Sequence, residues 1–522
     1  MTTLLPPPRL TSAAVVFYGP QGAVTQQAAR RGVPRQTLYR EADAVLRALD
    51  PLPHEKERAQ LQRGLAELRA DCARLQQQLA SAVVLGADQQ AEFAATAQAL
   101  GVSLSAARAL LAVLLGAAAP STAALGRLTR AAGRRAGCVL TTLDPLSRGR
   151  ARQVAADEVF SGRRPVLMTV EQDSLCWLGG RLADDRDGET WAGEFAALTA
   201  AAQVTADGGV GLHKGLALAN ARRRQAGLPP LAEQRDHFHV LHRARRALCT
   251  ARCRARGALR RAERLQQAYD QAGRAGRPRS PAQGRQLHRA WAGAEQAFDD
   301  WSAQEAAARR LQTGLRLVTP QGELNTRAQA EAEAAQALAG QTGPDWARAR
   351  RLLGPEAFTF LDRAQQELDA LPVAAELRQA AMRVEGLRQR PELLRGESAS
   401  ARAARGVLLA AGLVLALAGE AGQRARELVR GVLRGAWRSS SSVEGINSAL
   451  RMRQARQKRL TQGLLDLQRL YWNLHPFVAG RRKGTHPYGR LGLTLPAGGW
   501  WAVLNMPPEQ LQQQLSALNP AA

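Results

Sequence analysis

The sequence predicts a mixed α/β core that is interrupted by a large all-α insertion and preceded by all-α modules. Three observations carry this prediction. Short apolar runs typical of strands occur between residues 165 and 238, separated by helical patterns. Residues 243–436 are rich in Ala, Arg, Gln, Glu and Leu and contain no convincing strand. At 522 residues, the chain is also too long for one core, so several domains are expected.

The first 50 residues predict a helix-turn-helix module that binds DNA. A short helix from about residue 24 ends at Gly32, and a second helix starts at Arg35 after Val33-Pro34. The start of the second helix is where such modules contact DNA, and it carries Arg35, Gln36, Thr37 and Arg40. An ordinary helical hairpin is the alternative interpretation.

Residues 51–150 predict a helical arm followed by further helix-turn-helix-like modules. Leucines at 61, 65, 68, 75 and 79 have a spacing that suits a short coiled coil or a helical arm. Residues 89–115 repeat the earlier layout, with Ser103 as the N-cap of a helix that begins at Leu104.

The core is expected in two parts, 151–242 and 437–495, separated by the helical insertion 243–436. Strands at 165–173 and 175–183 predict a hairpin that turns at 172–174. A helix (190–202), a strand (203–207), a second helix (212–225) and a strand (231–238) follow. A helix from residue 443 belongs to the second part, which ends in a basic segment, and 496–522 is expected to be a C-terminal tail.

Charge and cysteine usage restrict the partners and the compartment. The net charge of +27 comes almost entirely from arginine and points to nucleic acid or another anionic surface. The five cysteines are scattered without a CxxC pair, which indicates no disulfide framework and suits a reducing cytosol. No signal peptide is evident. The apolar run 407–419 is too short to span a bilayer, so we expect it to form a buried helix.

Carboxylates in separate elements suggest metal-dependent chemistry on a polyanion. Asp207 ends a strand and is followed by Gly208-Gly209, whereas Glu444 lies near the start of a helix. A third acid follows the run 165–170. It is Glu171 or Asp173, and Glu171 is preferred because it comes directly after the apolar alternation. Such carboxylates suit two Mg²⁺ or Mn²⁺ ions that assist phosphodiester cleavage. In the alternative interpretation, Ser441 and Glu444 form a capping box.

Three motifs, in this order, resemble bacterial DDE/D-type transposases of the ribonuclease-H-like superfamily. They are 204–209 (VTADGG), 235–239 (RDHFH, similar to the C/DxxH motif of members with a helical insertion) and 442–447 (SVEGIN) with Arg451; the tail around 471–488 is also similar. The resemblance implies a ribonuclease-H-like catalytic core in which Asp207, Glu444 and an earlier acid bind the metal ions. That acid is usually Asp, so Glu171 would be a departure. It also implies a short third strand, which we expect near 188–191.

The resemblance implies a transposase that binds double-stranded DNA at the element ends and in the target. We expect a homodimer or a larger assembly on DNA, in a bacterial cytoplasm and near the nucleoid. Asp236 and His239 would brace the core, because the neighbouring histidines and cysteines match no zinc module. Six further residues are predicted to contact DNA: Asn447, Arg451 and Lys458 on the Glu444 helix, and Arg481, Arg482 and Lys483 in the tail. The alternatives are a non-catalytic DNA-binding regulator derived from a transposase and a ribonuclease-H-like nuclease without strand transfer.

Overall fold

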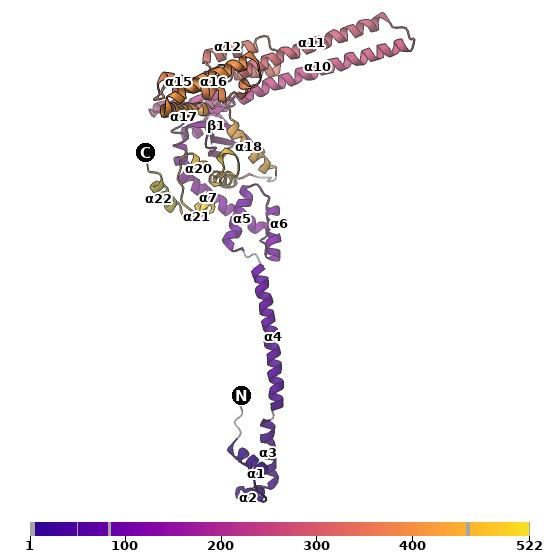
Figure 1. Ribbon diagram of the computed structural model, residues 1–522, viewed down its shortest axis with the longest axis vertical. Helices are drawn as coiled ribbons and strands as arrows, with labels where there is room; N and C mark the ends of the chain where they lie inside the picture. The colour runs from indigo at the N-terminus through magenta and orange to yellow at the C-terminus, as the bar shows by residue number, and fades with distance from the viewer. Residues whose placement is uncertain (1–5, 50, 82–84, 456–459, 521–522) are drawn as a thin grey trace. The chain divides into compact units, whose positions relative to one another are not determined.

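The computed structural model describes residues 6–49, 51–81, 85–455 and 460–520, and it is mostly helical with one five-stranded sheet (Figure 1). The chain divides into two compact units, residues 1–84 and residues 85–522. The coarse prediction of an α/β core with helical insertions and helical N-terminal modules is therefore confirmed at the level of secondary structure.

The N-terminal unit contains α1 (Pro7–Tyr18), α2 (Ala23–Arg31), α3 (Arg35–Leu49) and α4 (Pro51–Ser81). Gly32 ends α2 with a φ of +63°, and its N–H bonds to the carbonyls of Ala28 and Ala29, as expected of a glycine C-cap. Arg31 links the first three helices, because it bonds to Glu41 on α3 at 2.6 Å and to Ser12 on α1 at 2.6 Å. The helix pair predicted around Gly32 is thus present and tied to α1.

Helix α4 carries the leucines of the predicted coiled coil on an exposed face. Leu61, Leu65, Leu68 and Leu75 are between 50% and 73% exposed. A seam of apolar residues that repeats at alternating intervals of four and three residues matches the pattern by which one helix packs against another.

The second unit begins with α5 (Ala87–Ala99), α6 (Leu104–Leu115) and α7 (Thr122–Arg148). The Ser103 hydroxyl accepts a hydrogen bond from the Ala106 N–H, so Ser103 is the N-cap of α6 as predicted. Helix α7 is one continuous helix, and its Val139, Leu140 and Leu143 are buried in the core that includes the sheet. Residues 122–148 therefore support the core directly.

The sheet contains β1 (Gln153–Ser161), β2 (Arg164–Glu171), β3 (Trp177–Leu182), β4 (Gln203–Ala206) and β5 (Ala232–Arg235), in the order β3-β2-β1-β4-β5. Strand β1 pairs antiparallel with β2, β2 pairs antiparallel with β3, and β1, β4 and β5 are parallel. The predicted hairpin is present as β2 and β3, and the predicted strands at 203–207 and 231–238 appear as β4 and β5.

The structure contains a strand before the run at 165–173, which we expected to be the first strand of the sheet. Strand β1 precedes the run that we expected to be first, and β3 is the third strand, whereas 188–191 opens helix α8 (Gly188–Ala196). The acids Asp157 and Glu158 interrupt the apolar alternation of β1, which hid it. A local signal for it exists, because Gly162 (φ +63°) forms a two-residue turn between the paired Ser161 and Arg164.

Helices cover both faces of the sheet. On one face, α18 (Ser441–Gln454) packs Val443, Ile446 and Leu450 against residues of β1 and β2. The other core contains residues of α7, α8 and α9 (Val210–Gln225), together with α19 (Gln462–Leu474). Within the segment expected to be a C-terminal tail, α21 (Gly499–Asn505) and α22 (Pro508–Leu518) bury apolar residues in that same core.

The insertion is helical, as predicted, and it starts immediately after β5. Its helices are α10 (His237–Arg274), α11 (Pro281–Gly314), α12 (Arg327–Leu338), α13 (Pro344–Leu352), α14 (Thr359–Asp369), α15 (Ala375–Arg388), α16 (Ala399–Leu417) and α17 (Gly419–Gly435). They share a core that includes Leu311, Trp346 and Phe360. Helices α10 and α11 lie side by side as a long hairpin (Figure 1).

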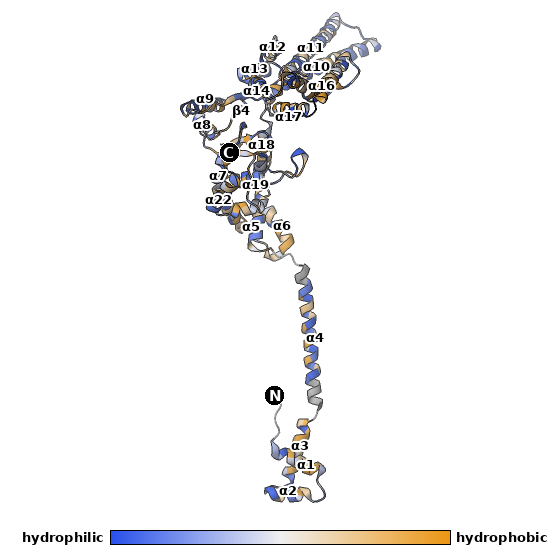
Figure 2. Ribbon diagram, turned by 60° about the vertical axis from the view of Figure 1, so that its left-hand side comes forward, coloured by the Kyte–Doolittle hydropathy of each residue, from blue (hydrophilic) through white to orange (hydrophobic). Residues whose placement is uncertain are grey.

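Helix α16 is less buried than we expected from the sequence. Ala411 and Leu415 are buried in the core of the insertion, but Leu409, Leu413 and Leu417 are 60–84% exposed. Figure 2 shows this helix mostly in orange, the colour of apolar residues. By length and composition α16 could cross a membrane, with a mean hydropathy of 1.5. Its residues 407–417 are apolar on all sides, and only one stripe of the helix packs in the core with α15 and α17.

Candidate active site

Two carboxylates lie just beyond the paired stretch of the parallel strands β1 and β4, one in the middle of β1 and one directly after β4. The strands pair in a fixed register, with Val154 opposite Val204 and Ala155 opposite Thr205. If the same register is continued for two more residues, Asp157 lies opposite Asp207. Neighbouring strands of a sheet lie about 4.8 Å apart. Residues on adjacent strands in register point to the same face of a sheet. The backbone pairing therefore brings the two acids together.

The surroundings of Asp157 strongly perturb its pKa. The residue is only 8% exposed, and burial, together with the negative charges of Glu444 and Asp207, raises its pKa from 3.8 to about 7. The backbone N–H of Glu158 opposes this rise by donating to Asp157 Oδ1 at 2.8 Å. Asp157, Asp207 and Glu444 thus form one electrostatic group, which we call the carboxylate site. An acid whose pKa is strongly raised by burial and by neighbouring acids is typical of functional sites.

Glu444 reaches the carboxylate site from the first turn of α18. Its neighbour one turn later, Asn447, is fully buried and donates from Nδ2 to Asp157 Oδ2 at 2.6 Å. Glu444 is partly exposed, and its carboxylate lies 3.6 Å from the Arg451 guanidinium. Helix α18 therefore contributes a carboxylate, an amide that orients Asp157, and a cation.

The segment that leads into α18 is tied to the ends of three strands. Gln172, just after β2, donates to the Ser439 carbonyl at 2.8 Å, and Gln203 on β4 donates to the Trp437 carbonyl at 3.0 Å. Asp236, directly after β5, accepts a hydrogen bond from the Ser440 hydroxyl. These bonds hold the first turn of α18 against the sheet although 200 residues of insertion precede it.

The capping-box alternative for Glu444 does not match the hydrogen bonds around this helix start. Helix α18 starts at Ser441, and its N-cap is Ser440, which makes no side-chain bond to the helix. The Ser440 hydroxyl bonds to Asp236 instead. The Glu444 carboxylate is therefore free to act in the carboxylate site.

The two glycines after Asp207 shape the loop beside it. Gly208 has a φ of +78°, which strongly favours glycine, and the Gly209 N–H donates to Asp207 Oδ1 at 2.8 Å. A Cβ on Gly208 would lie 3.0 Å from Arg235 Nη1. The loop thus keeps a cation and backbone N–H groups close to Asp207.

Glu171 and Asp173 are not brought to the carboxylate site. Glu171 is buried opposite Val154, and its Oε2 accepts from the Ser174 N–H at 2.7 Å and from the Ser174 hydroxyl, so it holds the β2–β3 turn. Asp173 is exposed in that turn, 3.2 Å from Arg490. Asp157, which our reading of the sequence did not single out, lies three residues beyond Val154, about 10 Å along β1.

The carboxylate site fits hard divalent cations, which favour carboxylate and amide oxygens. The Oδ1 atom of Asn447 is buried and has no hydrogen-bond partner among the described residues, so an oxygen acceptor beside Asp157 remains unused. Among the described residues, no group of three or more His, Cys, Asp or Glu side chains is placed so that it could hold a metal ion by itself. Mg²⁺ keeps several waters and needs no closed cage. Asp157, Asp207 and Glu444 are the residues that would hold Mg²⁺ or Mn²⁺.

Asp236 and His239 hold the start of α10. Asp236 is buried, and its carboxylate accepts from the Phe238 N–H at 2.7 Å as the N-cap of α10. His239 lies one turn later, with Nε2 3.7 Å from the Asp236 carboxylate. Burial lowers the pKa of the intervening His237 to about 3, and His237 Nε2 lies 2.6 Å from the Ala357 carbonyl. These contacts join the sheet to the insertion.

The residues predicted to contact DNA lie in three places. Arg35, Gln36 and Arg40 are exposed at the start of α3, and Thr37 beside them is partly exposed. Arg481 and Lys483 are exposed, whereas Arg482 donates to the Asp173 carbonyl at 3.2 Å. Arg451 lies in the carboxylate site, Asn447 is buried, and Lys458 lies outside the described residues.

Comparison with known proteins adds no assignment to this geometry. No protein-family model matches this sequence, and no curated protein matches it at a significant level. The function is therefore inferred from the carboxylate site and the elements around it.

Proposed function

We propose that the chain is a DNA transposase that cleaves phosphodiester bonds and transfers strands with a ribonuclease-H-like core. The observation that carries the proposal is the meeting of Asp157, Asp207 and Glu444 in one electrostatic group. They come from the centre of β1, the end of β4 and the first turn of α18. Three carboxylates from separate elements, close enough for two of them to act on the charge of the third, suit metal-assisted chemistry on a nucleic acid in a strongly basic chain.

The arrangement of the strands supports a ribonuclease-H-like core. A meander of β1, β2 and β3 is extended by the parallel strands β4 and β5, and the acids lie on the first strand and at the end of the fourth. The DxxH segment follows the fifth strand, and Glu444 follows the insertion. This is the order of the motifs that resemble DDE/D transposases, now with an aspartate on the first strand.

Each residue of the carboxylate site has a separate task in this mechanism. When bound, two Mg²⁺ or Mn²⁺ ions would stabilise the attacking and leaving oxygens of an in-line displacement. Asp157 and Asp207 are held on paired strands, so their separation is set by the sheet. Asn447 orients Asp157 through its Nδ2 hydrogen bond. Arg451, beside Glu444, places a cation where a phosphate would approach.

Cleavage of the DNA ends of the chain's own element tests the proposal. With Mg²⁺, the full-length protein is expected to nick duplexes that carry these ends, and Asp207→Asn should lower the rate by about 10³-fold or more. Asp173→Asn is the matched control, because it removes an exposed carboxylate of the β2–β3 turn, and it should retain activity. Joined products on a target plasmid separate a transposase from a nuclease. Binding of the ends without any metal-dependent cutting would favour the regulator and overturn the proposal.

A further inference from the structure

Helix α10 carries an unusual excess of positive charge. Its 38 residues contain only Glu263 and Asp270 as acids. Against these two acids stand ten arginines, at 243, 245, 246, 252, 254, 256, 260, 261, 264 and 274.

Five of these arginines form a stripe along the side of α10 that faces away from its buried side. The stripe is spaced by seven and then by four residues, and all its members are exposed: Arg245, Arg252, Arg256, Arg260 and Arg264. The opposite side carries the buried Ala244, Ala247, Ala251, Ala255 and Ala262. At about 1.5 Å per residue, the arginine stripe is roughly 28 Å long.

The arginines of the stripe make no ion pairs with the described part of the chain, although the exposed Glu263 lies on the same side of α10. No acid forms an ion pair with any of its five arginines among the residues that the structure describes, and Arg264 Nε donates only to the Arg260 carbonyl, at 3.2 Å. By contrast, Arg243 and Arg246 on the same helix pair with Asp345, at 3.5 and 3.7 Å. Like charges four residues apart destabilise a helix. An external polyanion would relieve this repulsion.

The partner helix α11 shows that composition alone does not produce the stripe. It is also rich in alanine, but its four arginines are matched by the four acids Glu295, Asp299, Asp300 and Glu305. Arg309 pairs with Glu305 at 2.8 Å, and Arg310 lies 3.7 Å from Glu333. The excess positive charge of the hairpin thus comes from α10, and half of its arginines form the stripe.

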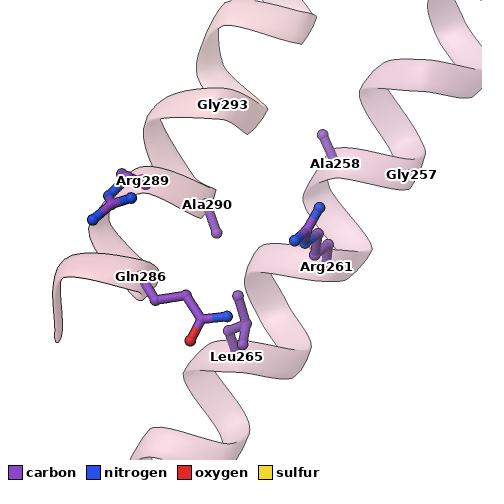
Figure 3. Close-up of a pocket in the computed structure, with 8 residues that line it drawn as sticks. All are labelled: Gly257, Ala258, Arg261, Leu265, Gln286, Arg289, Ala290 and Gly293. Carbon is purple, nitrogen blue, oxygen red and sulfur yellow. The ribbon is translucent and has the colours of Figure 1, made fainter. Parts of the chain in front are cut away.

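The outer part of the hairpin adds further cations beside the stripe. Between α10 and α11 lies an open cavity of about 770 Å³, where Gly257, Ala258 and Gly293 keep the helices from filling the space (Figure 3). Arg261 and Arg289 also line this cavity, one from each helix. Both are exposed, so positive charge continues around the outer half of the hairpin.

We propose that the arginine stripe binds the phosphate backbone of duplex DNA that runs along α10, beyond the DNA held in the carboxylate site. That this polyanion is DNA rests on the proposed function. Helix α10 starts directly after β5 and Asp236, so the stripe leads outward from the core. Each DNA strand carries a phosphate every 3.4 Å of duplex axis, so about eight phosphates of each strand lie within the length of the stripe, and those on the side that faces α10 are available to its arginines. A membrane-surface helix would expose an apolar face, whereas the alanine face of α10 is buried.

The salt dependence of DNA binding tests this surface. The full-length R252Q/R256Q/R260Q variant is compared with wild type on a duplex of about 40 base pairs of unrelated sequence. Loss of three phosphate contacts should lower the slope of log K against log salt by about 2.7. The affinity advantage of wild type should therefore shrink by about 40-fold between 50 and 200 mM salt. The control R402Q/R424Q/R434Q removes three exposed arginines elsewhere in the insertion and should leave the slope unchanged.

Two further variants separate the possible outcomes. R252K/R256K/R260K keeps the charges and should keep the wild-type slope, which would show that the glutamine variant acts through lost charge and not through misfolding. Asp207→Asn should abolish cutting with an unchanged slope. If the slope for the glutamine variant is unchanged, the stripe proposal is overturned even if wild type cuts DNA. It is also overturned if the glutamine variant loses binding to anionic vesicles but not to DNA. A normal stripe effect without cutting by wild type would refute the transposase and leave the stripe intact.

Discussion

Replacing Asp157 and Glu171 separately should have opposite effects, although both are buried acids on neighbouring strands. Asp157→Asn removes a charge from the carboxylate site and should abolish metal-dependent cleavage. Glu171→Gln removes a charge from the β2–β3 turn and should leave cleavage within a few-fold of wild type. The two variants also differ in their expected effect on stability, and activity and stability therefore give independent readouts.

The structure sets the size of the stability effect. Burial and the nearby acids raise the pKa of Asp157 from 3.8 to about 7. Since one decade of proton affinity is worth about 1.4 kcal/mol, the ionised form destabilises the metal-free fold by at most about 4 kcal/mol. An asparagine still has to be desolvated, so we expect Asp157→Asn to stabilise the metal-free protein at pH 8 by about 2 kcal/mol. The folded-state pKa is raised, so the gain should vanish as the pH falls towards 4, where Asp157 is protonated in the folded protein.

Glu171→Gln should destabilise the protein at the same pH. Its carboxylate accepts two hydrogen bonds from Ser174, and a neutral amide accepts more weakly, which should cost about 1–2 kcal/mol. Both values are measured by chemical denaturation at pH 8 with a chelator. Adding Mg²⁺ should then stabilise wild type and Glu171→Gln but not Asp157→Asn. An active Asp157→Asn, or a folded but inactive Glu171→Gln, would refute this assignment of the first acid.

Three other predictions concern the supports around the carboxylate site and the N-terminal unit. Ser440→Ala removes the bond to Asp236 that holds the start of α18. Because Ser440 acts by positioning, this variant should slow cleavage about tenfold and raise the Mg²⁺ requirement without changing DNA affinity. An equal loss of cleavage and of DNA affinity would contradict this role. The hydrogen bond from Arg31 lowers the pKa of Glu41 to about 2 from 4.5. The Arg31–Glu41 pair is partly exposed, so it should stabilise the N-terminal unit by no more than about 1 kcal/mol. This stabilisation should be present above pH 4.5 and lost as the pH falls towards 2. Hydrogen exchange in α1 and α3 at pH 6 and pH 3 measures this, and Glu41→Gln should remove the difference. If two copies of α4 pair in parallel and in register, the exposed Cys72 lies in the leucine seam, and mild oxidation should cross-link the dimer through it; a cross-link that persists in Cys72→Ser would argue against this pairing.

Local patterns were sufficient for most of the helices and for two of the three carboxylates. Gly32 ends α2 because glycine adopts the left-handed conformation that a helix C-cap requires. Asp207 is recognisable because a strand ends there and two glycines follow. Glu444 is recognisable because a polar helix start follows a long helical region. Each of these signals lies within a few residues of sequence.

The first acid depended on the sheet. Asp157 lies in a strand whose alternation is interrupted by its own acids, whereas Glu171 ends a clearly apolar strand and was therefore the more visible candidate. Only the register of β1 against β4 decides which acid faces Asp207, and this register joins segments 50 residues apart. The apolar run in α16 was misjudged for a similar reason, because its burial depends on which neighbours pack against it.

The sequence by itself determined the helical modules, the helical insertion, the strong positive charge and the positions of Asp207 and Glu444, because periodicity, caps and turns are encoded locally. The tertiary structure decided which residue is the third acid of the carboxylate site, which bonds hold the start of α18 to the strand ends, and how the C-terminal helices pack. It also decided that the alanine side of α10 is buried and that the arginine side is exposed. Strand pairing and helix packing join residues far apart in the chain, and no local pattern specifies them.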